Sequence, residues 1–264
     1  GVQTCALPIL LGSRPQFNKT KQVIISGEVN APGSYAIDDN TTLLELIRQA
    51  GSYTEQAYPI GGILMRENIK ELETASKEKS YNELIRYLVA SPNFSSILAS
   101  PDSKGIITFL SLLKDYEPIG RVATEFSIAK LNTNPTLNRV LEDGDRIHIP
   151  AFAPDVFIFG EVMNPGSVPY KEMANPQDYI AAAGNISRVA DEERILLISP
   201  SGEVEVITKR RFRIFQDNLM VLPGSTIYVP REVGKLDGIN LATSVAPIIS
   251  SVALSLASLN SINN

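Results

Sequence analysis

Residues able to support catalysis or metal binding are scarce in this sequence. His148 is the only histidine and Cys5 the only cysteine, so there is no second histidine or thiol for a metal site or a nucleophile–base pair. A disulfide within the chain is excluded for the same reason. We interpret His148 as an ordinary strand side chain, because the matching position of an internal repeat is Tyr228. The sequence therefore predicts no enzyme: no catalytic residue, no cofactor and no metal site.

Two acidic residues and a glycine pair are the other weak candidates for chemistry. Asp143 and Asp145 lie close together, but the matching residues of the repeat are Pro223 and Ser225. A turn is therefore favoured over acid–base chemistry or calcium binding. Gly61-Gly62 lacks the lysine and the spacing of a phosphate-binding loop.

The densest positive charge is a short basic run, which consists of Lys209, Arg210, Arg211 and Arg213. Its functional interpretation is contact with an acidic polysaccharide or with lipid phosphate. The favoured alternative is a solvated strand edge, where Lys and Arg discourage aggregation. The candidates for stacking on sugar rings, Tyr35, Tyr53 and Tyr58, are isolated along the chain, and ordinary surface positions are favoured for them.

The elements that would position any site come from a tandem duplication. Gly27–Ser34 (GEVNAPGS) and Gly160–Ser167 (GEVMNPGS) agree at six of eight positions, at a spacing of 133 residues. Leu141–Pro150 matches Val221–Pro230 at a spacing of 80 residues. The two spacings differ by 53 residues, so the first copy carries an insertion of that length. A repeat of this kind predicts two domains.

Each copy begins with the signals of a strand hairpin followed by a helix. Pro32-Gly33 is turn chemistry, which predicts a positive φ at Gly33 and at its counterpart Gly166. In the first copy, Thr42 and Glu45 form a capping-box pattern before an apolar helical run. In the second copy, Asn175 can cap the helix and Pro176 suits its first position. Two different solutions of the same local problem strengthen the helix prediction.

The remaining elements complete a small mixed sheet. Further strands are predicted at Gly62–Met65, Arg121–Phe126, Ile147–Ile149 and Arg194–Ile198. The insertion, about residues 67–118, is predicted to be helical, with a first helix over Ile69–Ala90 that breaks near Ser80. The fold class is therefore α+β, with two tandem β-grasp domains in which a helix covers one face of each sheet.

These motifs carry a family resemblance. The two GEVxxPGS segments, the helices ending in Ala-Gly and the closing DGDxIxIP segment at 143–150 look like the soluble ligand-binding β-grasp (SLBB) domain. Two such domains followed by an uncharged segment resemble the bacterial outer-membrane polysaccharide export family over residues 21–264. The expected domains are 21–150, with the helical insertion, and 151–232.

The resemblance implies a function without catalysis. Members form channels through which capsular or extracellular polysaccharide leaves the cell. The implied location is the outer membrane, with the β-grasp domains in the periplasm. The implied partners are an octamer-like homo-oligomeric ring, an inner-membrane polysaccharide co-polymerase, the polysaccharide and outer-membrane lipid. A net charge of −5 argues against nucleic acid. The alternative is a periplasmic carbohydrate- or small-ligand-binding module without a pore.

Residues 238–264 contain no charged side chain, and we call them the charge-free segment. Residues 238–262 are predicted as an amphipathic membrane-spanning helix. Its 23 residues from Ile239 to Ser261 would extend about 34 Å, enough for a hydrocarbon core of about 30 Å. The lipid-facing arc is Leu241, Val245, Ile248, Ile249, Val252, Leu256 and Leu259. The pore-lining arc includes Asn240, Thr243, Ser244, Ser251, Ser255 and Ser258. The alternative is an amphipathic helix that docks on a soluble core.

Residues 1–20 carry no signal of a domain. A short apolar run from Ala6 to Leu11 is interrupted by Pro8 and lacks the charged start of a secretory signal. Family members usually have a lipidated N-terminus and an export domain before the repeats. We therefore expect residues 1–20 to be a non-native or disordered remnant, and the chain to be a fragment that lacks those parts.

Overall fold

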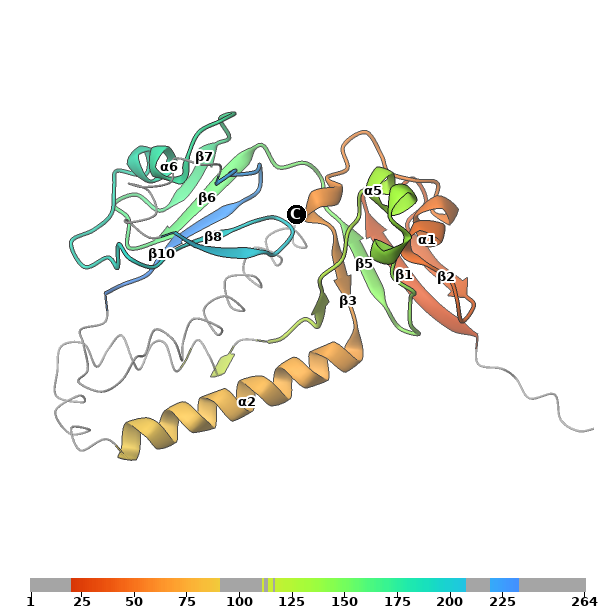
Figure 1. Cartoon of the computed structure of the whole chain (residues 1–264), viewed down its shortest axis with the longest axis horizontal. Helices are drawn as coiled ribbons and strands as arrows, with labels where there is room; N and C mark the ends of the chain where they lie inside the picture. The colour runs from red at the N-terminus through yellow and green to blue at the C-terminus, as the bar shows by residue number, and fades with distance from the viewer. Residues whose placement is uncertain (1–19, 91–110, 112–113, 116, 208–218, 233–264) are drawn as a thin grey trace, which may run out of the picture.

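The computed structural model describes residues 20–90, 111, 114–115, 117–207 and 219–232. Within these residues the chain forms two mixed five-stranded sheets (Figure 1). The first has the order β2-β1-β5-β3-β4 and the second the order β7-β6-β10-β8-β9. The first sheet contains β1 (Lys21–Gly27), β2 (Gly33–Ile37), β3 (Ile63–Met65), β4 (Arg121–Val122) and β5 (Arg146–Ile149). The second contains β6 (Asp155–Gly160), β7 (Gly166–Pro169), β8 (Ile195–Ile198), β9 (Val204–Ile207) and β10 (Thr226–Val229).

Each sheet is built around a hairpin whose first strand also pairs with the closing strand. β1 pairs antiparallel with β2 and parallel with β5, while β3 pairs antiparallel with both β5 and β4. β6 to β10 repeat this pattern strand for strand. The predicted pair of α+β domains is thus confirmed.

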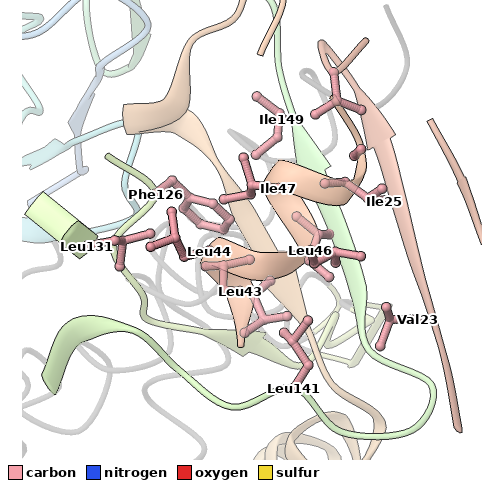
Figure 2. Close-up of a cluster of buried hydrophobic side chains, with 14 of the residues drawn as sticks. Val23, Ile25, Leu43, Leu44, Leu46, Ile47, Phe126, Leu131, Leu141 and Ile149 are labelled. Atoms are coloured by element: carbon pink, nitrogen blue, oxygen red, sulfur yellow. The ribbon is translucent and has the colours of Figure 1, made fainter. Parts of the chain in front are cut away.

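A helix covers one face of each sheet. α1 (Leu43–Gln49) and α6 (Pro176–Ala182) occupy the same place in the two domains (Figure 1). Figure 2 shows α1 directing Leu43, Leu46 and Ile47 toward the buried residues of β1 and β5. Full burial of one such side chain stabilises the fold by about 1.5–3 kcal/mol. The second domain has its own core, which includes Tyr179 and Ile180 of α6.

Both helices begin with a capping box. The Oγ1 of Thr42 accepts from the N–H of Glu45 at 3.4 Å, and Glu45 Oε2 accepts from the N–H of Thr42 at 2.8 Å. In the second domain, Asn175 Oδ1 accepts from the N–H of Asp178 at 3.1 Å, and Asp178 Oδ2 accepts from the N–H of Asn175 at 2.9 Å. The predicted caps are confirmed, and only the reciprocal role of Asp178 had not been predicted.

The prediction of a positive φ at the turn glycines is wrong for Gly33 and is met at Gly166 only by an almost extended backbone. Gly33 does not adopt a left-handed conformation, and Gly166, at φ 159°, is close to extended backbone. The constrained glycines are instead the first residues of the two GEV motifs. Gly27 has φ +83° and Gly160 has φ +92°. A Cβ atom on either would lie 2.0 Å from a carbonyl oxygen of the adjacent closing strand, so only glycine permits this close approach.

The insertion begins with α2 (Glu67–Ala90), which extends away from the first sheet as a long rod (Figure 1). The predicted break near Ser80 is wrong, because α2 is continuous and a single serine among Glu, Lys and Leu disfavours a helix only slightly. The predicted strand at Arg121–Phe126 is also too long, since β4 ends at Val122. Beyond it, Glu125 Oε1 accepts from the N–H groups of Phe126 and Ser127 and turns the chain into α5 (Ile128–Thr133).

Candidate functional site

The acidic turn before β5 is a structural anchor. Asp145 is fully buried, and its carboxylate accepts from Arg66 Nε and Nη2, both at 2.8 Å. It also accepts from the N–H of Glu142 at 2.8 Å, while Asp143 accepts from the N–H of Gln22 at 2.9 Å. Asp145 in turn raises the pKa of the Arg66 guanidinium, chiefly through these hydrogen bonds. The turn thus ties the start of the insertion to the closing strand.

The second domain uses a serine in the same place. Ser225 is fully buried and its Oγ accepts from the N–H of Leu222 at 3.1 Å, as Asp145 does from the N–H of Glu142. The shared role is to hold the turn, and only the first copy adds an arginine. No group of three or more His, Cys, Asp or Glu side chains suited to a metal occurs among the described residues.

His148 belongs to a contact between neighbouring strands. It pairs with Ser26 across β1 and β5, and its Nδ1 lies 3.1 Å from the Ser26 Oγ. The Ser26 hydroxyl also lies 3.1 Å from the carbonyl oxygen of Ile147, to which it donates. Because the Ser26 hydroxyl donates its proton to a backbone carbonyl, Ser26 is not poised as a nucleophile.

Two of the three tyrosines are unsuited to stacking on a sugar. Tyr53 donates to the carbonyl of Phe126 at 2.6 Å and packs against the first core. Tyr58 is buried, and its ring meets that of Phe152 edge-on with centroids 5.4 Å apart. Tyr35 donates to the carbonyl of Ala31 at 2.6 Å and keeps part of its ring exposed. The Tyr53 hydroxyl and the Tyr58 ring thus serve the fold.

The two domains meet at the turn between β8 and β9. Arg121 of β4 donates from Nη2 to the carbonyl oxygen of Pro200 at 3.1 Å. Gly202 leaves room for that guanidinium, since a Cβ there would lie 2.7 Å from its Cζ. Burial lowers the pKa of Arg121 to about 10. Gly61 and Gly224 bring Tyr58 and Pro200 together in the same region.

The second sheet is apolar on both faces. One row of neighbours on the face opposite α6 consists of Phe159, Tyr228, Leu196 and Val206. The next row consists of Phe157, Thr226, Ile198 and Val204. We call these eight residues the apolar outer face. They alternate along the strands with core residues such as Ile158 and Leu197, which pack toward α6.

The apolar outer face is open in part. Phe159 is 43% exposed and Val206 41% exposed, whereas Leu196 and Ile198 are buried. The rings of Phe157 and Phe159 are parallel within 2°, with centroids 6.4 Å apart. Burial raises the pKa of the Tyr228 phenol, and the charge of Glu161 adds to the effect. Such a surface suits an apolar partner better than a charged one.

The first sheet has diverged at the matching positions. Ser26 and His148 stand where the second sheet has Phe159 and Tyr228, and Arg146 stands where it has Thr226. The outer face of the first sheet thus mixes these polar and charged groups with apolar residues such as Ile24, Ile63 and Met65.

The apolar outer face was not predicted from the sequence, although β8 carried a signal. A half-buried strand alternates apolar and polar residues, whereas β8 reads Ile-Leu-Leu-Ile without alternation. That run is typical of a strand buried on both faces.

The sites predicted from composition lie outside the described residues. They are the basic run of Lys209, Arg210, Arg211 and Arg213, the pore-lining Asn240, Thr243, Ser244, Ser251, Ser255 and Ser258, and the lipid-facing Leu241, Val245, Ile248, Ile249, Val252, Leu256 and Leu259. The remnant at 1–20 also lies outside them, except for Thr20. Among the helices that are described, none is both long enough and apolar enough to span a membrane.

Comparisons with known proteins agree with the duplicated fold. The SLBB domain model matches residues 22–66 and 156–208, one segment in each domain. The polysialic acid transport protein KpsD of Escherichia coli is 24% identical over 217 residues, which are 81% of this chain and 38% of that protein. A second Escherichia coli protein of the same name is 24% identical over 196 residues, 73% of this chain and 34% of that protein. The chain thus spans little more than a third of the length of these relatives.

The two sheets, their helices and the doubled match define a protein with two SLBB domains. The first match ends at Arg66, where the insertion begins. Together with the similarity to KpsD, the doubled domain supports a relationship to the polysaccharide export proteins that carry two SLBB domains. The matched relatives are named as transport proteins, which is consistent with a role other than catalysis.

Proposed function

We propose that the chain is part of a subunit of an outer-membrane channel that exports capsular or extracellular polysaccharide without catalysis. The observation that carries the proposal is the pair of SLBB domains in a chain similar to KpsD over 81% of its length. KpsD is named for transport of polysialic acid, which is a polysaccharide. The two domains lie in the periplasm and surround the path of the polymer in a homo-oligomeric ring.

The charge-free segment supplies the membrane part of this proposal. Its apolar arc faces lipid and its hydroxyl arc lines the pore, while the absence of charge over residues 238–264 avoids the cost of burying ions in a bilayer. An inner-membrane co-polymerase delivers the polymer to the ring. The basic run at Lys209–Arg213 contacts acidic groups of the polymer or lipid phosphate.

The alternative is a periplasmic carbohydrate- or small-ligand-binding module without a pore. The SLBB match supports it as well, because a single domain of this type needs no ring to bind a ligand. Sedimentation in detergent separates the two functions. A ring must have a mass several times the 28.8 kDa of the chain, whereas a module sediments at the mass of one chain.

A pair of arginine substitutions tests the arrangement in the membrane. Leu256 and Ser255 are adjacent, yet they lie about 100° apart around a helix. In Leu256→Arg, an arginine facing lipid near mid-membrane costs roughly 2.5–3.5 kcal/mol per subunit, so stable insertion should fail. In Ser255→Arg, the side chain stays hydrated in the lumen, so insertion should persist while export changes.

Both variants are made in the full-length protein and scored by outer-membrane fractionation and by surface polysaccharide. Ser255→Arg is the matched control, since it adds the same charge one residue away. Normal insertion and export by Leu256→Arg would show that this face does not meet lipid. The ligand-binding module would then be the better function.

A further inference from the structure

The apolar outer face is buried at Leu196, Ile198 and Thr226 but remains open to water in part. Seven of its eight residues are apolar or aromatic, with Thr226 as the exception, and they form two unbroken rows across four strands. Phe159 and Val206 nevertheless keep 43% and 41% of their surface exposed. A contiguous apolar surface of this kind marks a place where something docks.

The duplication shows that part of this face is not required by the fold. The first domain keeps apolar residues at three matching positions, Ile24, Ile63 and Met65. It folds, however, with Ser26 and His148 in place of Phe159 and Tyr228, so the β-grasp sheet does not need aromatic residues there. Apolar residues that the fold does not require point to a binding partner of apolar chemistry.

The chain itself supplies such a partner next to this sheet. β10 is the central strand of the second sheet and ends at Val229, and the backbone is held as far as the N–H of Glu232, which donates to the carbonyl of Val189 at 2.7 Å. The charge-free segment begins at Gly238, and its first apolar-arc residue is Leu241. Leu241 lies nine residues beyond Glu232, which is up to about 30 Å of chain. The three strand spacings from β6 to β9 amount to only about 14 Å.

We infer that the apolar outer face of the second sheet is the dock for the charge-free segment of the same chain before that segment enters a bilayer. The apolar arc covers Phe159, Tyr228 and Val206, and its hydroxyl side faces water. A short tether keeps the effective concentration of the segment in the millimolar range, so modest contacts suffice. The docking step stands on the described sheet, whereas release into lipid rests on the proposed function.

The dock would allow the charge-free segment to lack charge and still keep its apolar arc out of water before it inserts into lipid. An apolar arc free in the periplasm would drive aggregation, and the dock shields it until lipid competes for the same side chains. Docking and insertion use one surface of the segment, so they exclude each other.

Disulfide trapping in the full chain tests the docking step. In a Cys5→Ser background, Phe159→Cys is combined with Val252→Cys on the apolar arc. One control combines Phe159→Cys with Ser251→Cys on the hydroxyl side. The other combines Val252→Cys with Ile24→Cys, because Ile24 occupies the place of Phe157 in the first sheet and is 42% exposed. Each chain is oxidised mildly in detergent-free buffer, and the linkage is read by mass spectrometry.

We expect the first pair to form a disulfide within one chain several-fold faster than either control. Addition of Val206→Glu to that pair should slow the reaction toward the rate of the controls. Equal rates for all three pairs would overturn the dock, since an unbound tether samples both sides of the segment alike. Disulfides found only between chains, detected by mixing isotopically labelled and unlabelled protein, would assign the face to a second copy instead.

Flotation with lipid vesicles then separates this inference from the proposed function. If the trapping is specific but the reduced chain never floats with vesicles, the dock stands and the membrane function fails. If the chain floats but the trapping is unspecific, the dock fails and the membrane function stands. When both hold, the disulfide-locked chain should float only after a reductant is added.

Discussion

Gly27 is the last residue of β1 and lies against the backbone of β5. Substituting alanine for it tests how much this close approach contributes to the free energy of unfolding. In Gly27→Ala the new Cβ would lie 2.0 Å from the carbonyl oxygen of Ile149. That oxygen also accepts from the N–H of Glu28 at 2.8 Å. Relief of the overlap breaks this hydrogen bond, which contributes about 1 kcal/mol, and the φ of +83° adds roughly 1–2 kcal/mol of left-handed strain. We expect the unfolding free energy to fall by about 2–3 kcal/mol.

Two other glycines separate the cost of the left-handed φ from the cost of the steric overlap. Gly33 has no left-handed φ, and a Cβ added there would meet no atom within 4 Å, so Gly33→Ala should change stability by less than about 0.5 kcal/mol. Gly144 has φ +84° and equally open space, so Gly144→Ala should cost roughly 1–2 kcal/mol from strain alone. Urea unfolding followed by circular dichroism gives each difference from the midpoint and slope. Equal midpoints for Gly27→Ala and Gly33→Ala would refute the reasoning.

Two further predictions concern buried polar groups. Arg66→Ala should destabilise the first domain by about 3 kcal/mol, because it leaves the fully buried Asp145 without its cation. Lys21→Ala removes an exposed pair and should leave the urea midpoint unchanged. Burial, aided by the charge of Glu125, raises the pKa of Tyr53, so its contribution is complete below about pH 10 and is lost as pH rises through its folded pKa. Tyr53→Phe should therefore flatten the loss of melting temperature above about pH 10, and an unchanged slope would contradict this.

The duplicated segments predict the two domains well because they hold the local signals of each fold. Capping by Thr42 and Asn175 depends on residues within one helical turn, so sequence spacing is sufficient to find it. The GEVxxPGS motif likewise locates both hairpins. These features depend on neighbours in the chain, which a sequence displays directly.

The errors arise where distant residues decide the outcome. Gly27 and Gly33 look alike in the sequence, but only Gly27 meets the backbone of Ile149, which is far along the chain. The burial of Asp145 depends on Arg66, whose position no local pattern indicates. The extent of β4 depends on Glu125, which draws the chain into α5.

The candidate site was harder to predict than the fold. The basic run and the hydroxyl-rich segment were predicted as sites because each is a continuous stretch of unusual composition. The apolar outer face, by contrast, consists of residues on four separate strands. Phe159 and Val206 belong to the same row only because of the sheet register. The register of a sheet depends on residues far apart in the sequence. The local signal for this face was the unbroken apolar run of β8, which indicates a strand buried on both faces.

The pairing of the first strand with the last sets the order in which each domain can acquire its structure during synthesis. Ile25 pairs with Ile147 across 122 residues, whereas Ile158 pairs with Ile227 across 69. Because loop-closure entropy grows only logarithmically, the longer loop costs just about 0.5 kcal/mol more. The effect on timing is larger, since a sheet cannot close before its central strand has been made. The β1–β2 hairpin and α1 must therefore persist without β5 while the whole insertion is translated. The second domain, free of that delay, can complete its sheet after a much shorter stretch of synthesis.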